Sequence, residues 1–143
     1  MKKTASEYGC SVEATLDVIG GKWKGVILYH LLQDTRRFGE LQRLMIGVTR
    51  RMLTLSLREL EEAGIVHREV YKQVPPKVEY SLTEYGRSLE PVISSLRTWG
   101  EIYMSRIECA DRGPLADIEA KDEKDQLATT RSAQYAELAK PDE

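Results

Sequence analysis

Two adjacent prolines, Pro75 and Pro76, interrupt a region in which apolar and polar side chains otherwise alternate. The alternation runs over residues 66–71 and again over 78–82, which is typical of two strands. Proline donates no backbone hydrogen bond and holds the residue before it extended, so the pair belongs at a turn and not inside a sheet. The sequence therefore predicts a stiff antiparallel hairpin with these prolines in its turn.

The segment before the hairpin has its apolar residues at helical spacing. Such stripes over 11–19, 22–32 and 38–45 predict three helices. The pair Gly20-Gly21 separates the first two.

A fourth helix is predicted over 49–63, with Thr49 as its N-cap and Gly64 at its end. Because Gly47 lies in the short connection from the third helix, these two helices form a helix-turn-helix. The core side of the fourth helix is expected to carry Leu53, Leu57 and Leu60.

A final helical region follows the hairpin from Thr83 to about residue 108, and Pro91 should kink or split it near Arg87. Its apolar face is wider than a surface helix of one small domain needs. That face includes Leu89, Val92, Ile93, Leu96, Trp99, Tyr103 and Ile107. The predicted fold is mainly α with a small β-hairpin (α+β), in the order of a winged helix-turn-helix.

Positive charge is concentrated in one short segment, although the whole chain of 143 residues has a net charge of −2. Between residues 36 and 58 there are six arginines and one acidic residue, Glu40. Residues 1–108 sum to +2 and residues 109–143 to −4. Such a local basic patch is the electrostatic pattern of a nucleic-acid contact.

Two parts are expected: a DNA-binding and dimerisation domain over 1–108, and an acidic, Ala-rich tail over 109–143 with at most a loose helix around 132–138. No apolar run is long enough for a membrane span, and no apolar stretch follows the N-terminal lysines as in a secretory signal. A cytoplasmic, nucleoid-associated location is expected.

The sequence resembles the HxlR-type family of bacterial transcriptional regulators from Cys10 to about Gly100. The resemblance is carried, in this order, by "GGKW" (20–23), "RFGEL" (37–41), "LRELEEAGIVHR" (57–68), "PPKVEYSLTEYG" (75–86) and "WG" (99–100). It implies a cytoplasmic homodimer that binds palindromic operator DNA and acts as a repressor. The first helix and the final helices would form the dimer interface, with Val12, Leu16, Leu89, Val92, Ile93, Leu96, Trp99 and Tyr103 as candidates.

A regulator of this class, expected to act as a repressor, would contact DNA mainly through its fourth helix. Arg51, Leu55 and Arg58 share one face of that helix, beside Arg50 and Thr54 and away from the leucines. Arginine can bind guanine O6 and N7 with two hydrogen bonds, and we expect Arg50, Arg51 or both to do so. Phosphate contacts are expected from Arg36, Arg37, Lys72 and Lys77, with Thr49 at the helix start. For each of these residues the alternative is a solvated surface charge, and Arg58 has the further alternative of an ion pair with Glu61 or Glu62.

The two cysteines, Cys10 and Cys109, are candidates for redox sensing. Cys10 lies at the start of the first helix, where unpaired amides and the helix dipole favour an anion. In the family that the chain resembles, a cysteine at this place is frequent and in several members senses oxidants, quinones or aldehydes. If the first helix packs against the last helix of a partner, Cys109 would approach Cys10 of the other chain, and a reversible intersubunit disulfide is a hypothesis. The alternative is two idle thiols.

Other chemistry has little support in the sequence. His30 and His67 have no Cys, His or carboxylate at metal-ligand spacing, so no metal site and no cofactor are expected. No phosphate-binding glycine loop, nucleophile elbow or paired-carboxylate pattern indicates an enzyme. Two alternatives remain: a regulator that answers to a small-molecule effector without a redox switch, and a winged-helix module that binds another protein.

Overall fold

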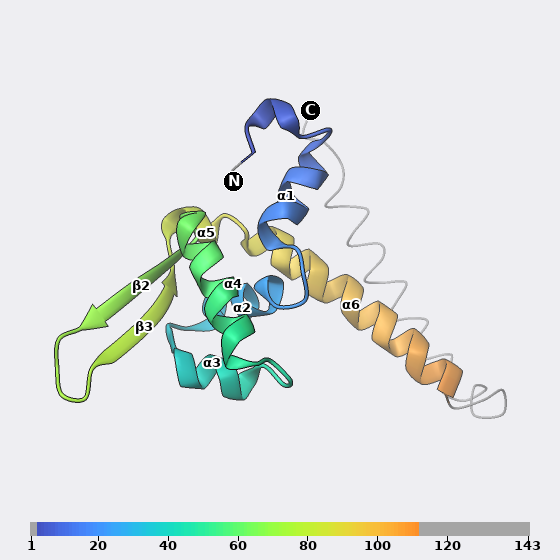
Figure 1. Ribbon diagram of the computed structural model, residues 1–143. Coiled ribbons are helices and arrows are strands. Elements are labelled where there is room, and N and C mark those ends of the chain that lie inside the picture. The colour runs from blue at the N-terminus through green and yellow to red at the C-terminus, as the bar shows by residue number, and fades with distance from the viewer. Residues whose placement is uncertain (1–2, 112–143) are drawn as a thin grey trace. The chain divides into compact units, whose positions relative to one another are not determined.

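The computed structural model describes residues 3–111, and Figure 1 shows the arrangement of their helices and strands. The chain divides into two compact units, residues 1–94 and 95–143. The predicted loose helix around 132–138 lies outside the described residues, as does most of the predicted tail. Among the described residues, no helix has the length and apolar character needed to cross a membrane.

The first unit begins with four helices, as predicted. After a short 3-10 helix, η1 (Ala5–Glu7), come α1 (Ser11–Ile19), α2 (Lys24–Gln33), α3 (Phe38–Leu44) and α4 (Arg50–Glu62). The second of these begins two residues later than predicted, because Trp23 takes the N-cap position and its side chain is buried in the core. Gly47, with φ of +86°, makes the turn between α3 and α4 in a backbone conformation that favours glycine.

Both ends of α4 are closed by local hydrogen bonds. At its start, Thr49 Oγ1 accepts a hydrogen bond from the backbone N–H of Met52 at 3.2 Å, which confirms the predicted N-cap. At its end, Gly64 has φ of +76°, its N–H bonds to the carbonyl of Glu61, and the N–H of Ile65 bonds to the carbonyl of Leu60. This pairing is the Schellman motif, so the length of α4 is fixed at both ends by the sequence itself.

The predicted hairpin is present as β2 (Val66–Tyr71) and β3 (Lys77–Leu82), and Figure 1 shows it extending away from the helices of this unit. Residues 72–76 connect the strands, and the Val74–Pro75 peptide bond is cis. A third strand, β1 (Arg36–Arg37), pairs antiparallel with β3 and gives the sheet order β1-β3-β2. The prediction of a two-stranded sheet was therefore incomplete, because a strand of two residues is too short to show alternation.

The region after the hairpin is split, as Pro91 predicted. Helix α5 (Glu84–Arg87) is separate from α6 (Glu90–Asp111). Pro91 lies in the first turn of α6, where backbone N–H groups have no hydrogen-bond partner within the helix, so the N–H that proline lacks costs no helical hydrogen bond. Thr83 caps α5, and its Oγ1 also donates to the backbone carbonyls of Gly64 and Ile65 at 2.6 and 3.1 Å. One hydroxyl thus joins the end of α4, the start of β2 and the start of α5.

The core of the first unit is formed by α2, α3, α4 and the sheet. Its fully buried side chains include Ile27, Leu28, Leu41, Met45, Leu53, Leu57 and Leu60. The three leucines of α4 therefore face inward, as their spacing predicted.

Candidate nucleic-acid interface

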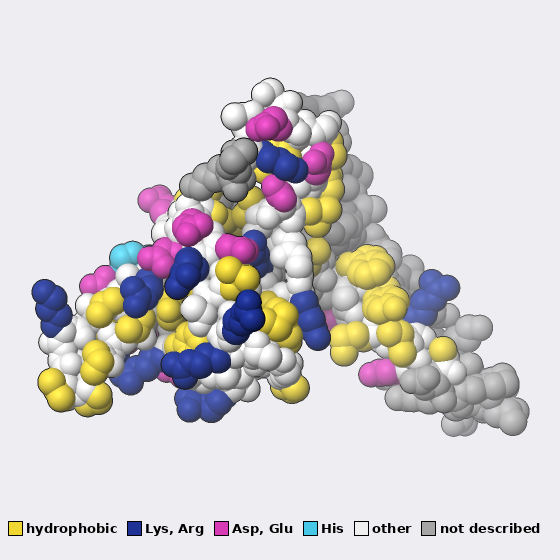
Figure 2. Space-filling view, viewed as in Figure 1, with side chains coloured by type: hydrophobic (Ala, Val, Ile, Leu, Met, Phe, Trp, Pro, Cys, Tyr) yellow, Lys and Arg dark blue, Asp and Glu magenta, His cyan; other side chains and the backbone are white. Residues whose placement is uncertain are grey.

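Helix α4 presents its basic residues to solvent because its leucines occupy the opposite face. Arg50, Arg51 and Arg58 are all exposed, and Leu55 is exposed between them. Arg51 and Arg58 form no ion pair within the described part of the chain, so the predicted alternative of a bridge from Arg58 to Glu61 or Glu62 is not present. Figure 2 shows basic side chains gathered over the part of this unit that contains α3 and α4, whereas acidic ones lie over α1 and around α5.

The remaining residues predicted on α4 are also exposed. Thr54 donates from Oγ1 to the carbonyl of Arg50 at 2.8 Å, which leaves the oxygen lone pairs as acceptors. The guanidinium of Arg50 lies over the ring of Phe38, 5.2 Å from its centroid. Arg50 is therefore held against α3, and Arg51 is the less restrained of the two adjacent arginines.

The two arginines of β1 differ in their environment. Arg37 is exposed, whereas Arg36 is half-buried, with Nη1 4.0 Å from Oε2 of Glu40 and Nε without a partner among the described residues. Burial, followed by the positive charge of Arg36, lowers the pKa of His30 below its ordinary value. Of the two predicted phosphate contacts, Arg37 is thus the more accessible.

The two lysines of the hairpin differ in the same way. Lys72 lies exposed in the turn, but Lys77 is the first residue of β3 and its Nζ is 2.7 Å from Oε1 of Glu79. The hydrogen bond from Lys77 holds the pKa of Glu79 below its ordinary value, and the negative charge of Glu79 raises the pKa of Tyr71. Lys77 also lies over the ring of Tyr71, 4.9 Å from the centroid. Its charge is therefore partly compensated, and Lys72 is the better placed phosphate contact.

The candidate dimer residues fall into two groups. Val12 and Leu16 on α1, and Leu96, Trp99 and Tyr103 on α6, are exposed apolar side chains. The rings of Trp99 and Tyr103 are stacked, with centroids 5.5 Å apart and planes at 9°.

The other three candidates lie wholly or partly in the core of their own chain. Ile93 is only 4% exposed and belongs to the core of its own chain, and Leu89 and Val92 pack against that core. The prediction of Ile93 as an interface residue was wrong, because the start of α6 packs into the core of the first unit. Ile102, Met104 and Ile107, further along the helix, are exposed instead.

Both cysteines are free and exposed. Cys10 is the N-cap of α1, and its Sγ accepts the backbone N–H of Glu13 at 3.5 Å. The carboxylate of Glu13 in turn accepts the N–H of Gly9 at 2.9 Å and lies 3.6 Å from Nζ of Lys3. Cys109 lies in the last turn of α6, because the helix continues to Asp111 and does not end at about residue 108 as predicted. Within the described residues, no group of three or more His, Cys, Asp or Glu is placed to hold a metal ion.

A short helix, a glycine turn, an exposed arginine helix and a β-hairpin in succession define a winged helix-turn-helix protein. The chain belongs to the HxlR-like helix-turn-helix family, whose family model matches residues 18–108. The resemblance found in the sequence is thereby confirmed.

The relatives of this chain are helix-turn-helix transcriptional regulators. The HTH-type transcriptional regulator YdeP of Bacillus subtilis (strain 168) is 65% identical over 100 residues, which cover 70% of this chain and 78% of YdeP. The redox regulator HypR in its oxidised form is 64% identical with a TM-score of 0.63, over 64% of this chain and 95% of HypR. The reduced regulator YodB of B. subtilis is 33% identical with a TM-score of 0.57, over 66% of this chain and 94% of YodB.

Proposed function

We propose that the chain is a homodimeric transcriptional regulator that binds a palindromic operator and acts at the bacterial nucleoid. The observation that carries this proposal is the orientation of α4, which buries Leu53, Leu57 and Leu60 and leaves Arg51 and Arg58 exposed and unpaired within the described residues. A helix of this kind fits the major groove of DNA, which admits an α-helix. Whether binding represses or activates then depends on where the operator lies relative to the promoter.

Within the proposal, base recognition belongs to Arg51, supported by Arg50 and Thr54. Leu55 and Met52, which are exposed beside them, suit contact with thymine methyl groups. The phosphate contacts come from Arg37 and Lys72, which are exposed, with smaller contributions from Arg36 and Lys77. These contacts position the protein but carry no sequence information.

The homodimer is supported by the apolar side chains that α1 and α6 leave exposed. Trp99 is 63% exposed and Tyr103 is 52% exposed, and apolar patches of this kind mark contact surfaces. Two recognition helices related by a two-fold axis would meet half-sites about one DNA turn apart, roughly 34 Å, or a multiple of it.

A thiol switch at Cys10 completes the proposal. Its Sγ is exposed and caps α1, the helix that also carries Val12 and Leu16. HypR and YodB, to which the chain is similar, are described as a redox regulator and as a regulator studied in reduced and diamide-treated forms. Oxidation or alkylation of Cys10 would thus act at the start of a proposed dimer helix and alter operator affinity.

The test begins with duplexes selected by the protein from a random pool, compared with scrambled duplexes by fluorescence anisotropy at several salt concentrations. Arg51→Ala should cost about 1–3 kcal/mol on the selected duplex and little on the scrambled one. Arg87→Ala, which removes the same charge from an exposed position of α5, serves as the matched control. Equal losses on both duplexes for Arg51→Ala would contradict base recognition, and a failure to select any sequence would contradict the proposed function.

A further inference from the structure

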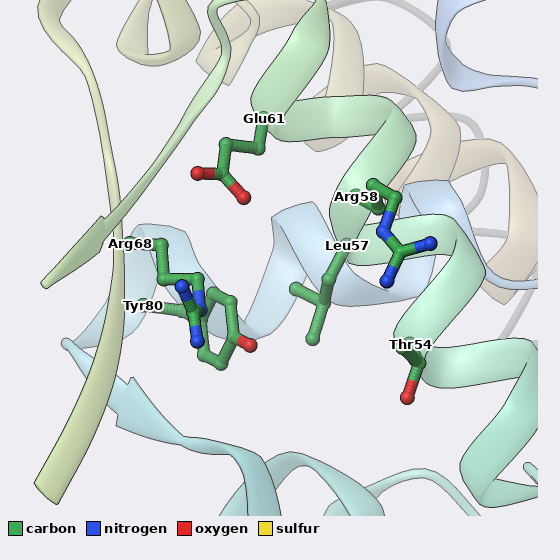
Figure 3. A pocket seen from close by; sticks show the side chains of 6 residues that line it. All are labelled: Thr54, Leu57, Arg58, Glu61, Arg68 and Tyr80. Atoms are coloured by element: carbon green, nitrogen blue, oxygen red, sulfur yellow. The ribbon is translucent and has the colours of Figure 1, made fainter. Parts of the chain in front are cut away.

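A pocket of about 230 Å³ lies between α4 and the hairpin. Thr54, Leu57, Arg58 and Glu61 form the wall on the helix, and Arg68 and Tyr80 form the facing wall on β2 and β3. Figure 3 shows the two walls, with the hydroxyl of Tyr80 pointing toward the helix. Arg58 and Thr54 were predicted as functional residues, but Glu61, Arg68 and Tyr80 were not, so the pocket itself was not predicted.

The pocket is built by two regular spacings. On α4, Thr54, Arg58 and Glu61 follow one another at i, i+4 and i+7 and so share a face, with the buried Leu57 beside them. On the sheet, Arg68 and Tyr80 are directly opposite in the β2–β3 register, which places their side chains next to each other on one face.

The two arginines and the tyrosine of the pocket are available to a ligand. Neither Arg58 nor Arg68 forms an ion pair within the described part of the chain, and the hydroxyl of Tyr80 has no hydrogen-bond partner there. The lining contains two guanidinium groups and one carboxylate, that of Glu61, so its net charge is positive. A site of this composition favours an anion that accepts several hydrogen bonds, and arginine binds phosphate through two parallel N–H donors.

The volume and the position of the pocket indicate the source of that anion. At about 230 Å³ it is smaller than the roughly 300–1,000 Å³ of pockets that enclose whole drug-sized ligands. One sugar-phosphate strand separates the major groove of DNA from the adjacent minor groove. If α4 enters the first and the hairpin lies along the second, that strand must pass between α4 and the hairpin, across the pocket.

We infer that this pocket binds one backbone phosphate of the operator, held by Arg58 and Arg68 with the hydroxyl of Tyr80. The inference rests on the proposed function and makes it more specific, because it assigns Arg58 to a phosphate and adds Arg68 to the interface. Glu61 opposes the bound phosphate and limits affinity for DNA of any sequence.

The first test measures the salt dependence of binding to selected and scrambled duplexes. Arg68→Ala should weaken binding to both duplexes alike, roughly tenfold or more. The slope of log K against log salt, which is negative, should become shallower by about 0.9. Glu61→Gln should strengthen binding to both duplexes, a gain that a folding defect cannot produce. Arg87→Ala is again the control and should leave the slope unchanged.

The second test locates the phosphate. Uncharged methylphosphonate is placed at each backbone position of the selected duplex in turn. Methylphosphonate at one position per half-site should weaken DNA binding by the wild-type protein. The loss should be smaller in the Arg58→Ala and Arg68→Ala variants, because each keeps only one of the two arginines.

Three results would overturn the inference while the proposed function stands: an unchanged salt slope for Arg68→Ala, a loss confined to the selected duplex, or no methylphosphonate position whose effect is smaller in the two variants than in the wild type. The inference would also be overturned by saturable binding of free inorganic phosphate in the pocket if Arg68→Ala left the salt dependence of DNA binding unchanged. That result would assign the pocket to a small anion. If the wild-type protein discriminates no sequence at all, the proposed function itself fails.

Discussion

The guanidinium of Arg50, the first residue of α4, lies 5.2 Å from the centroid of the ring of Phe38, the first residue of α3. This cation–π contact joins the starts of the two helices of the helix-turn-helix. It therefore restrains a candidate DNA-binding side chain and the angle between two helices with one interaction.

Replacing Phe38 with leucine should weaken operator binding roughly two- to fivefold, since a cation–π contact at an exposed site contributes about 0.5–1 kcal/mol. Leucine keeps the apolar contact with the core, against which Phe38 packs. Anisotropy measurements in the wild-type and Arg50→Ala backgrounds form a double-mutant cycle. The change should have no further effect once Arg50 is gone, and an equal loss in both backgrounds would show that Phe38 acts through the fold alone.

Trp99→Asp should convert the dimer to monomer, because an exposed tryptophan stacked on Tyr103 is the kind of residue that dominates an interface. We expect the dissociation constant to rise roughly thirtyfold or more, as measured by analytical ultracentrifugation. Ser105→Asp adds the same charge to an exposed polar position of α6 and is the matched control. A wild-type chain that sediments as a monomer would contradict the proposed dimer, and so would a Trp99→Asp dimer of unchanged affinity.

Cys10→Ser should abolish the response of operator binding to diamide and to quinones. Serine is itself a favourable N-cap, so this variant keeps the hydrogen bond to the N–H of Glu13 and the start of α1. Non-reducing gels then test the intersubunit disulfide. Diamide should produce a dimer band in the wild type and none in Cys10→Ser or Cys109→Ser, and release of DNA that persists in Cys10→Ser would exclude the thiol switch.

His30 should make the protein less stable as the pH falls. Burial, helped by the charge of Arg36, lowers the pKa of His30 in the folded state, so the unfolded chain binds its proton more readily. The stabilisation is complete above the ordinary histidine pKa of about 6.5 and is lost as the pH falls through it toward the lower folded value. Urea unfolding between pH 7.5 and pH 5.5 should show a smaller decrease in unfolding free energy for His30→Gln than for the wild type, and parallel profiles would contradict the assignment.

Local patterns predicted the elements that carry the proposed function. The spacing of Leu53, Leu57 and Leu60 gave the orientation of α4, and Pro75 and Pro76 gave the turn of the hairpin. Both features depend on neighbours in the sequence, which is why they could be predicted without the fold.

Features that depend on contacts between distant segments could not be predicted in the same way. Apolar periodicity does not tell whether a side chain packs in the core of its own chain or against a partner chain. Ile93 was predicted at the interface with a partner, but it lies in the core of its own chain. The pocket arises from the register that sets Arg68 beside Tyr80 and from the packing of α4 nearby. The pairing of Lys77 with Glu79, in contrast, had a signal, since residues two apart on a strand lie on the same face.

The position of Ile93 has a consequence for the whole chain. The first turn of α6 is anchored in the core, while the same continuous helix further along exposes the apolar side chains of Leu96, Trp99, Ile102, Tyr103, Met104 and Ile107. A second copy that covers those later turns would bind the native chain and not the unfolded one. By mass action, the melting temperature should therefore climb as the protein is made more concentrated.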